Sequence, residues 1–343
     1  MKALVYTQPY TFEYRDVPDP APAPDEVLVR VRDCGICGSD VQGATGSTGR
    51  RLPPLIMGHE AAGVVEAVGE MVTGFRTGDR VAFDSTVYCN QCEPCRQGLF
   101  NRCVRRQVLG VSTPAFKRNG AFAEYVAVPS WIVAAVPESV SLRQAALLEP
   151  ASIALHAANR AQVAAGETVV VVGAGTIGLF VIQAARLRGA ARVIVTDLSD
   201  YRLELARKLG ADVRVNPQRE DLREAVLRET GGRGAPVVFE AVGFARTLRD
   251  AVSAVAMGGR VAMIGNLEKT AELDVQEIVA RELTLVGSYA SAGEFRACLE
   301  AMAEGRLDTA PVISEVLPLS EGKRAFERLL RREEKLLKVL LEP

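Results

Sequence analysis

The chain has 343 residues, of which 48% are hydrophobic, and its 41 basic and 42 acidic side chains give a formal net charge of −1. This balance excludes the strongly basic surface by which proteins attract nucleic acid or anionic membranes, and no apolar run approaches the roughly eighteen residues that cross a bilayer. The N-terminal residues carry no signal-peptide pattern. We therefore expect a cytoplasmic protein of two domains whose partner is a small molecule, with no nucleic acid and no membrane.

The first half of the chain predicts mostly β-structure. A proline-rich loop comes first, and short segments with alternating apolar and polar residues follow it, separated by Gly, Pro and Asp: residues 26–33, 61–68, 79–84 and 121–129. Such alternation is typical of strands with one buried face. A β-rich first domain is the expected result.

Two motifs within this half contain chemically reactive side chains. CGICGSD includes Cys37, and GHEAAGVVEAVG places His59 beside Glu60. A zinc-protease helix is excluded, because H-E-x-x-H requires histidine where Gly63 stands. Taken singly, Cys37 is more typical of a buried small side chain and His59 of a hydrogen-bonded core histidine. Only their combination suggests a site.

Four of the seven cysteines lie close together, in the order Cys89, Cys92, Cys95 and Cys103. In a reducing compartment such a cluster indicates metal binding or redox chemistry rather than disulfides. The spacing C-x2-C-x2-C-x7-C can place four thiolates tetrahedrally around one zinc with no position left for water, which predicts a closed structural site. The alternatives are cysteines without metal and an iron–sulfur cluster, although the ferredoxin run has a shorter last spacing and a following proline.

From Leu142 the pattern changes to helical spacing, and strands and helices then alternate to about residue 287. An apolar strand is followed directly by the motif G-x-G-x-x-G, formed by Gly173, Gly175 and Gly178. A helical pattern begins within this motif, at Thr176. Backbone amides at such a helix N-terminus bind a pyrophosphate. The alternative is that these glycines merely allow tight packing of the strand on the helix.

A carboxylate follows at a suitable distance. Asp197 ends the next predicted strand, where a carboxylate hydrogen-bonds the adenosine ribose hydroxyls. It would also repel a 2′-phosphate, so NAD is predicted in preference to NADP, although Arg202 could stack on adenine or meet a phosphate. The expected cofactor-binding set is completed by Thr176, Ile177, Val242 and Gly265.

With these motifs in this order, the chain resembles the zinc-containing medium-chain alcohol and polyol dehydrogenases, in particular their sorbitol dehydrogenase-like and galactitol-phosphate dehydrogenase-like branch. The resemblance covers essentially the whole chain: GICGSD, GHEAAGVVEAVG, the four-cysteine lobe, LLEP, and GAGTIG followed by aspartate. It implies a GroES-like barrel as the zinc-binding catalytic domain at 1–150, with a structural-zinc lobe at 88–104. Residues 151–287 would form a Rossmann domain, a doubly wound parallel sheet that binds NAD, and 288–343 would return to the first domain. A homodimer or homotetramer is expected.

The resemblance further implies a second, catalytic zinc held by Cys37, His59 and a carboxylate from Glu60 or Glu149. Members of the polyol branch carry Glu at the position of Glu149. We favour Glu149, because neighbours on an extended chain point to opposite faces and Glu60 adjoins His59, whereas Pro150 should hold Glu149 in an extended conformation. Glu60 is then expected close by and able to exchange. The two remaining cysteines match no ligand position and are interpreted as packing residues: Cys34 and Cys298.

These residues suggest oxidation of an alcohol to a ketone. Three protein ligands leave zinc a fourth position at which a substrate hydroxyl is ionised, and NAD accepts the hydride. Ser39 has a hydroxyl able to accept the substrate proton, and Asp40 is expected either to orient His59 or to act only as a turn former. Many relatives continue the proton relay through a histidine near position 42, where this chain has Gln42.

The sequence leaves the substrate open among secondary alcohols, polyols and sugar-alcohol phosphates, with threonine oxidation as the alternative. An Arg-Tyr pair that contacts the polyol in sorbitol-type relatives is replaced by Ala290 and Ser291. Arg50 and Arg51, near the expected mouth of the site, could bind a phosphate or be solvated surface charge. A zinc-free quinone reductase and a non-catalytic descendant are disfavoured, because every ligand residue is intact.

Overall fold

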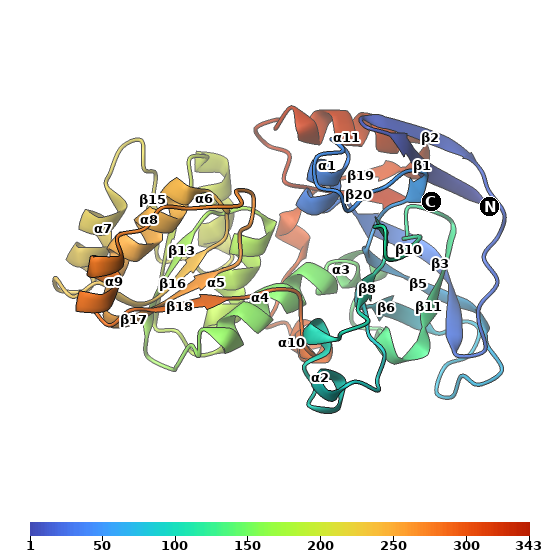
Figure 1. Ribbon diagram of the computed structural model, residues 1–343, viewed down its shortest axis with the longest axis horizontal. Coiled ribbons are helices and arrows are strands. Elements are labelled where there is room, and N and C mark those ends of the chain that lie inside the picture. Colours follow the sequence, from blue (N-terminus) through green and yellow to red (C-terminus); the bar gives the residue numbers. More distant parts are fainter. The chain divides into compact units, whose positions relative to one another are not determined.

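The computed structural model describes residues 1–343 and divides into two compact units. The first unit combines Met1–Glu149 with Phe295–Pro343, so the N-terminal and C-terminal segments belong together, and the second is Pro150–Glu294 (Figure 1). The chain thus returns to the first unit at Phe295 rather than at residue 288, because the segment after the last strand of the second unit continues up to helix α10, Glu294–Ala303. No helix is both long and apolar enough to cross a membrane.

A sheet of seven strands forms the frame of the first unit, in the order β12-β6-β5-β3-β20-β19, with β11 also pairing with β3. All of these pairs are antiparallel except β19 with β20. The strands are β3 Glu26–Gly35, β5 Glu60–Val68, β6 Arg80–Phe83, β11 Tyr125–Pro129, β12 Val133–Ala135, β19 Ile313–Pro318 and β20 Lys338–Glu342.

The pairing of β3 with β5 brings the two reactive motifs of the sequence together. Gly35, within CGICGSD, is opposite Glu60, within GHEAAGVVEAVG, and Cys34 is opposite Ala61. Buried and partly buried residues alternate along the first part of β3, in agreement with the alternation of apolar and polar residues that predicted it. The sheet register therefore places the residues that follow Gly35 beside those that precede β5.

Smaller elements complete the first unit. A three-stranded sheet has the order β2-β1-β4, and two short pairs are β10-β9 and β7-β8. These strands are β1 Lys2–Gln8, β2 Thr11–Asp16, β4 Leu55–Ile56, β7 Thr86–Val87, β8 Gln107–Val108, β9 Val111–Ser112 and β10 Lys117–Arg118. The helices are α1 Gly38–Gly43, α2 Glu93–Arg96, α3 Leu142–Ala145, α10, α11 Gly322–Leu330 and the 3-10 turns η1 Phe100–Arg102, η2 Ser130–Ile132, η3 Ala310–Val312 and η4 Leu319–Glu321.

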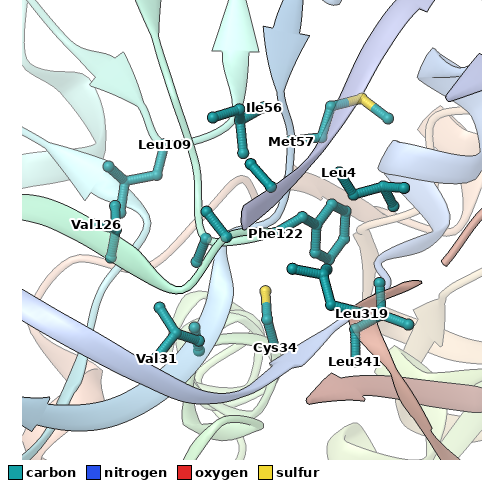
Figure 2. Close-up of a cluster of buried hydrophobic side chains, with 14 of the residues drawn as sticks. Leu4, Val31, Cys34, Ile56, Met57, Leu109, Phe122, Val126, Leu319 and Leu341 are labelled. Atoms are coloured by element: carbon teal, nitrogen blue, oxygen red, sulfur yellow. The ribbon is translucent and has the colours of Figure 1, made fainter. Parts of the chain in front are cut away.

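The core of the first unit joins its N-terminal and C-terminal segments (Figure 2). The ring of Phe326, from α11, stacks on Phe12 at a centroid distance of 4.2 Å and meets Phe122 edge-on at 5.9 Å. Such aromatic pairs contribute about 0.5–1.5 kcal/mol beyond their buried area. Cys34 is fully buried in the same cluster, and Cys298 is fully buried in α10. Burial raises the pKa of the Cys34 thiol well above its usual range.

The second unit is a six-stranded sheet in the order β15-β14-β13-β16-β17-β18, with every pair parallel. This order is that of a doubly wound Rossmann fold, as predicted. The strands are β13 Thr168–Val172, β14 Arg192–Thr196, β15 Val213–Val215, β16 Ala235–Glu240, β17 Val255–Met263 and β18 Thr284–Gly287. The helices are α5 Thr176–Leu187, α6 Asp200–Lys208, α7 Leu222–Glu229, α8 Ala245–Ala254 and α9 Val275–Ala280, and α4 Leu148–Arg160 carries the chain into this unit.

Strand β13 lies at the centre of this sheet and is buried over Val169–Val172. A continuous run of valine is typical of a parallel strand covered on both faces. The strand order reverses at β13, since β14 lies on one side and β16 on the other. In doubly wound sheets the ligand crevice opens at such a switch point, at the carboxyl ends of the strands.

Candidate active site

The glycine-rich turn at the carboxyl end of β13 has the geometry of a dinucleotide cradle. Gly173 has φ +97°, and a Cβ there would lie 2.4 Å from Val242 Cγ2. A Cβ on Gly178 would lie 1.8 Å from the Gly173 carbonyl oxygen, so α5 packs directly on the turn. A Cβ on Gly175 would meet nothing within 4 Å, and no side chain caps α5 there. The residues therefore fit a pyrophosphate at this helix N-terminus.

Asp197, directly after β14, is held beside this turn. Its Oδ2 accepts a hydrogen bond from the Ala174 amide at 2.8 Å, and its Oδ1 accepts one from the Ser199 amide at 2.9 Å. Arg202 Nη1 is 3.9 Å from the same carboxylate. A fixed carboxylate at this position suits the ribose hydroxyls of a dinucleotide.

A buried glutamate organises the neighbouring loop and was not recognised from the sequence. Glu240 Oε1, at the end of β16, accepts hydrogen bonds from the amides of Val242 and Gly243 and from Thr247 Oγ1, at 3.0, 2.8 and 2.7 Å. A Cβ on Gly265 would lie 2.1 Å from the Gly243 amide nitrogen, so the two predicted cofactor residues, Val242 and Gly265, belong to loops in close contact. The available signal was an acidic residue that ends an apolar strand just before a glycine.

The four-cysteine lobe of the first unit gathers its sulfur atoms as the spacing predicts. The Sγ atoms of Cys89, Cys92, Cys95 and Cys103 all lie within 4.8 Å of one another, and none forms a disulfide. Hydrogen bonds from the amides of Gln91 and Cys92 lower the pKa of Cys89 to about 5. Amides directed at sulfur stabilise thiolates, which are the form that binds zinc. The donor set fits a closed tetrahedral zinc site.

A second cluster forms where β3 and β5 meet. Cys37 caps the N-terminus of α1, His59 precedes β5 and Glu60 begins it. One ligand atom from each of these three residues lies within 4.8 Å of the others. A Cβ on Gly58, which has φ +93°, would lie 2.7 Å from the Phe122 ring, so only glycine permits the turn that precedes His59. Sulfur, imidazole and carboxylate together form a donor set that fits zinc.

Glu60 is held in this cluster by a buried lysine that was not recognised from the sequence. Lys338 Nζ, from β20, lies 2.6 and 2.9 Å from the two Glu60 oxygens and donates to the Ile36 carbonyl at 2.9 Å. Burial alone would lower the pKa of Lys338, but the negative groups around it, Glu60 first and then Cys37 and Asp40, together raise the pKa above its usual value. A Cβ on Gly35 would lie 2.3 Å from Glu60 Oε2, so the glycine makes room for this pair. The only sequence signal was a lysine at the start of an apolar strand.

Asp40 is completely buried and lies close to both His59 and the start of α1. Its Oδ2 lies 3.5 Å from His59 Nδ1, where it can orient the imidazole. The same oxygen accepts a hydrogen bond from the Cys37 amide at 3.3 Å and thereby caps the N-terminus of α1. Its Oδ1 accepts a hydrogen bond from Arg51 Nη2 at 2.9 Å. Burial alone would raise the pKa of Asp40, but His59 and Arg51 hold this pKa well below its usual range.

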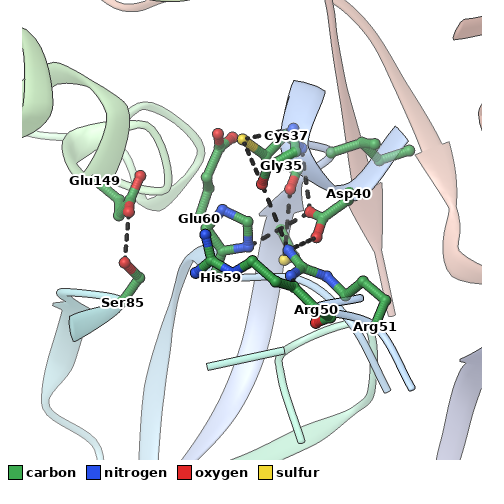
Figure 3. A network of polar contacts seen from close by, with 12 residues as sticks. Gly35, Cys37, Asp40, Arg50, Arg51, His59, Glu60, Ser85 and Glu149 are labelled. Carbon is green, nitrogen blue, oxygen red and sulfur yellow. Dashed lines mark hydrogen bonds and ion pairs between the residues drawn. The ribbon is translucent and has the colours of Figure 1, made fainter. Parts of the chain in front are cut away.

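The two adjacent arginines do not act as a pair. Arg50 is exposed, whereas Arg51 is 6% exposed and ion-paired with Asp40 (Figure 3). Neither sequence interpretation therefore describes Arg51, which is neither solvated surface charge nor available to a phosphate at the mouth of the site. The reason is that the Asp40 carboxylate, in the first turn of α1, provides a buried counter-charge that the sequence pattern does not reveal.

Glu149 differs from its prediction in conformation and in position. It lies in the first turn of α4 rather than in an extended segment, because a proline in the first helical turn removes an amide that would have no partner anyway. Its Oε1 accepts a hydrogen bond from Ser85 Oγ at 2.6 Å, and Figure 3 shows it apart from Cys37 and Glu60. It is not among the residues gathered within 4.8 Å of Cys37 and His59. Burial raises the pKa of Glu149 to about 7, with smaller effects from His59 and Glu60.

The hydroxyl expected to accept the substrate proton lies at the edge of this cluster. Ser39 Oγ donates to Cys37 Sγ at 3.3 Å and is close to Arg51 Nη2 at 3.4 Å. Gln42 lies in α1, and Ala290 and Ser291 follow β18 in the second unit. The chain thus contains a dinucleotide cradle, a closed four-sulfur site and a mixed sulfur, nitrogen and oxygen site beside a hydroxyl. Together these can support hydride transfer from an alcohol.

Comparisons with known proteins agree with this chemistry. The model of the "Alcohol dehydrogenase GroES-like domain" matches residues 23–138, and that of "Zinc-binding dehydrogenase" matches residues 176–304. The chain is 36% identical to a sorbitol dehydrogenase of Bacillus subtilis over 100% of this chain and 97% of the relative. It is 38% identical to an L-threonine 3-dehydrogenase of an Anaeromyxobacter species over 95% of each chain.

A solved structure shows the same fold over the full length. The alcohol dehydrogenase TADH from Thermus sp. ATN1 superimposes with a TM-score of 0.93 at 34% identity, covering 100% of this chain and 99% of that one. Both the GroES-like first unit and the Rossmann second unit are thereby confirmed. The chain is a member of the zinc-containing medium-chain alcohol and polyol dehydrogenase family.

Proposed function

We propose that the protein oxidises a secondary alcohol or polyol to the ketone with NAD as the hydride acceptor. The observation that carries this proposal is the cluster of Cys37, His59 and Glu60 beside the Ser39 hydroxyl, in a chain that also contains a dinucleotide cradle. Bound zinc supplies a Lewis acid that favours ionisation of the substrate hydroxyl, and the nicotinamide supplies the hydride acceptor. Ser39 accepts the substrate proton as its own hydroxyl proton passes to solvent water, to which Ser39 is exposed, and Asp40 keeps His59 in the orientation that leaves its Nε2 free for metal.

A polyol without phosphate is the favoured substrate class. The relative named sorbitol dehydrogenase supports a polyol, although Ala290 and Ser291 replace the pair expected for sorbitol itself. A phosphorylated polyol has less support, because Arg51 is committed to Asp40 and only Arg50 is exposed. Threonine oxidation is the second candidate, since a relative named L-threonine 3-dehydrogenase is 38% identical.

The substrate class can be tested with zinc-loaded protein and NAD. Reduction of NAD is measured across secondary alcohols, vicinal diols, longer polyols, their phosphates and L-threonine. We expect the highest kcat/KM with an uncharged secondary alcohol or polyol, because the described site offers no free cation cluster for a phosphate. Preference for L-threonine would select the second candidate, and no turnover with any alcohol would refute the function.

We propose two zinc ions per chain, held by separate ligand sets. Cys89, Cys92, Cys95 and Cys103 hold the structural ion, and Cys37, His59 and Glu149 hold the catalytic ion, with Glu60 nearby. Two observations support Glu149 over Glu60 even though Glu60 lies closer in this structure. Lys338 contacts both Glu60 oxygens and balances the charge of Glu60, whereas Glu149 Oε1 accepts a hydrogen bond from the neutral Ser85 hydroxyl.

Elemental analysis of freshly purified protein should therefore give two zinc ions per chain. Glu149→Ala should lose the catalytic ion, with a fall in zinc affinity that exceeds the roughly 10- to 100-fold typical of outer-shell partners, while Glu60→Ala keeps it. Cys95→Ser should lose the structural ion and stability, because closed zinc sites contribute folding energy. Zinc titration of the three variants measures these effects. Loss of the catalytic ion only in Glu60→Ala would reverse the assignment, and one ion in the unmodified protein would refute the two-site proposal.

We also propose that NAD is preferred over NADP through Asp197. Replacing Asp197 by Asn keeps the shape of the side chain and removes the negative charge that repels a 2′-phosphate. Loss of a charged hydrogen bond is worth about 1.5–3 kcal/mol, so kcat/KM for NAD should fall about 10- to 100-fold while that for NADP rises. Arg202→Ala is the matched control and should instead lower kcat/KM for NADP. An unmodified protein with the higher kcat/KM for NADP would contradict the proposal.

Assembly as a homodimer or homotetramer is proposed from the edge of the second unit. Strand β18 ends the parallel sheet, and beside it Met257, Val275 and Val279 are 76, 67 and 69% exposed. A second copy that pairs its own β18 antiparallel about a two-fold axis would cover this edge. None of the seven cysteines forms a disulfide, which supports a reducing compartment, the cytoplasm.

Light scattering on the purified protein tests the assembly. We expect the mass of a dimer or tetramer, and Val279→Glu should shift it toward the monomer, because a charge would be buried at the paired edge. Met71→Glu, at an apolar side chain of the first unit that is 69% exposed, is the matched control and should leave the mass unchanged. A monomer at micromolar concentration would contradict the proposal.

A further inference from the structure

Arg51 reaches the interior because the backbone around it is fixed. The Leu52 amide donates to the Ser112 carbonyl at 3.1 Å, and the Ser112 amide donates to the Arg50 carbonyl at 3.2 Å. These two bonds hold the segment extended against β9, and neighbours on an extended segment point to opposite sides. Arg50 is therefore directed to solvent and Arg51 to the cluster beside α1.

Helix α1 leaves a passage for the Arg51 side chain. A Cβ on Gly43 would lie 2.5 Å from Arg51 Cγ and 3.5 Å from its Cβ and Cδ, so the aliphatic stem crosses the helix where a side chain is missing. Gly43 and Asp40 are three residues apart and therefore share one face of α1, so the side chain follows this face from Gly43 to the Asp40 carboxylate. Residues from two segments, Gly43 and Asp40 of α1 and Ser112 of β9, thus fit one arginine in one orientation.

The Arg51 guanidinium contacts two groups that the proposed reaction uses. Its Nη2 donates to Asp40 Oδ1 at 2.9 Å and to Ser39 Oγ at 3.4 Å. Because Oδ1 is taken, Asp40 turns Oδ2 toward His59 Nδ1 and the Cys37 amide. A hydroxyl has one donor and two acceptor sites, so Ser39, which donates to Cys37 Sγ and accepts from Arg51, has one acceptor site left for substrate.

We propose that Arg51 is a positioning residue of the active site, which fixes the Ser39 hydroxyl and the Asp40 carboxylate relative to each other. This inference rests on the proposed function. A guanidinium is not deprotonated in proteins, so Arg51 orients the proton acceptor and carries no proton itself. Its planar fork can serve two acceptors at once, which the single ammonium of lysine does less well.

The test uses Arg51→Met, which keeps the length of the stem and removes the guanidinium, with Arg51→Lys as the conservative variant and Arg50→Met as the matched control. Two quantities are measured in each full-length variant: affinity of the metal-depleted protein for Co²⁺, read from the absorption bands of a cobalt–thiolate site, and kcat and KM for alcohol and for NAD. We expect Arg51→Met to lower the Co²⁺ affinity of the mixed site about 10- to 100-fold, because Asp40 no longer holds His59. Its kcat should fall by a similar factor, while KM for NAD stays unchanged.

Arg51→Lys separates positioning from charge compensation. It should restore the Co²⁺ affinity, because a cation again neutralises Asp40, but kcat should stay about tenfold low, because one ammonium does not hold Ser39 and Asp40 together. Arg50→Met should match the unmodified protein in both measurements. If Arg51→Met does not fold, the low kcat of Arg51→Lys at normal Co²⁺ affinity carries the test.

Three results would overturn the inference. Normal Co²⁺ affinity and normal kcat in Arg51→Met would show that the arginine does not position the site. Full recovery of kcat in Arg51→Lys would reduce its role to charge compensation. If KM rose only for phosphorylated polyols in Arg51→Met and Arg51→Lys, Arg51 would be a substrate ligand instead. If the unmodified protein oxidises no alcohol, the proposed function fails, and the Co²⁺ titration still tests whether Arg51 holds Asp40 against His59.

Discussion

Two buried ion pairs, Asp40 with Arg51 and Glu60 with Lys338, determine how the reactive end of the first unit can be built. All four side chains are almost inaccessible to water, and an unpaired charge in such a place is strongly unfavourable. Removing one partner of a buried pair typically destabilises a protein by about 3–5 kcal/mol, because the remaining charge stays uncompensated. Cys37 and His59 lie between the two carboxylates, so the cations that hold those carboxylates also hold the surroundings of the thiol and the imidazole.

The two sulfur-containing clusters are assembled in different ways. The four-cysteine lobe takes all its sulfur atoms from one short segment, and local amides stabilise the thiolate of Cys89. The mixed cluster depends instead on the pairing of β3 with β5 and on contacts 11 and 278 residues apart along the chain, those of Asp40 with Arg51 and of Glu60 with Lys338. A local site needs only its own loop, whereas the mixed cluster needs the sheet of the first unit to be complete.

This difference explains how far the sequence alone could lead. Alternating residues predicted β3 and β5, the valine run and the glycines predicted β13 and its turn, and the cysteine spacing predicted a sulfur cluster, because each signal is contained within a few residues. Arg51 and Lys338 could not be identified in this way, since each is recognised as buried only when its partner in another segment is known. Glu240 was missed although its partners lie within seven residues of it. Glu149 was assigned an extended conformation from the proline that follows it, but the helix tolerates that proline in its first turn.

The position of Lys338 in the last strand has a consequence for the order in which the molecule matures. Synthesis proceeds from the N-terminus, so the segment with Cys37 and His59 and the four-cysteine lobe leave the ribosome long before β20 exists. Until β20 adds to β3, Glu60 lacks its counter-charge and the sheet exposes an unpaired edge. The second unit is made in that interval and contains its whole sheet within one continuous segment. The nascent chain can therefore complete its nucleotide-binding half first, and a chain that stops short of residue 338 lacks the cation that Glu60 requires.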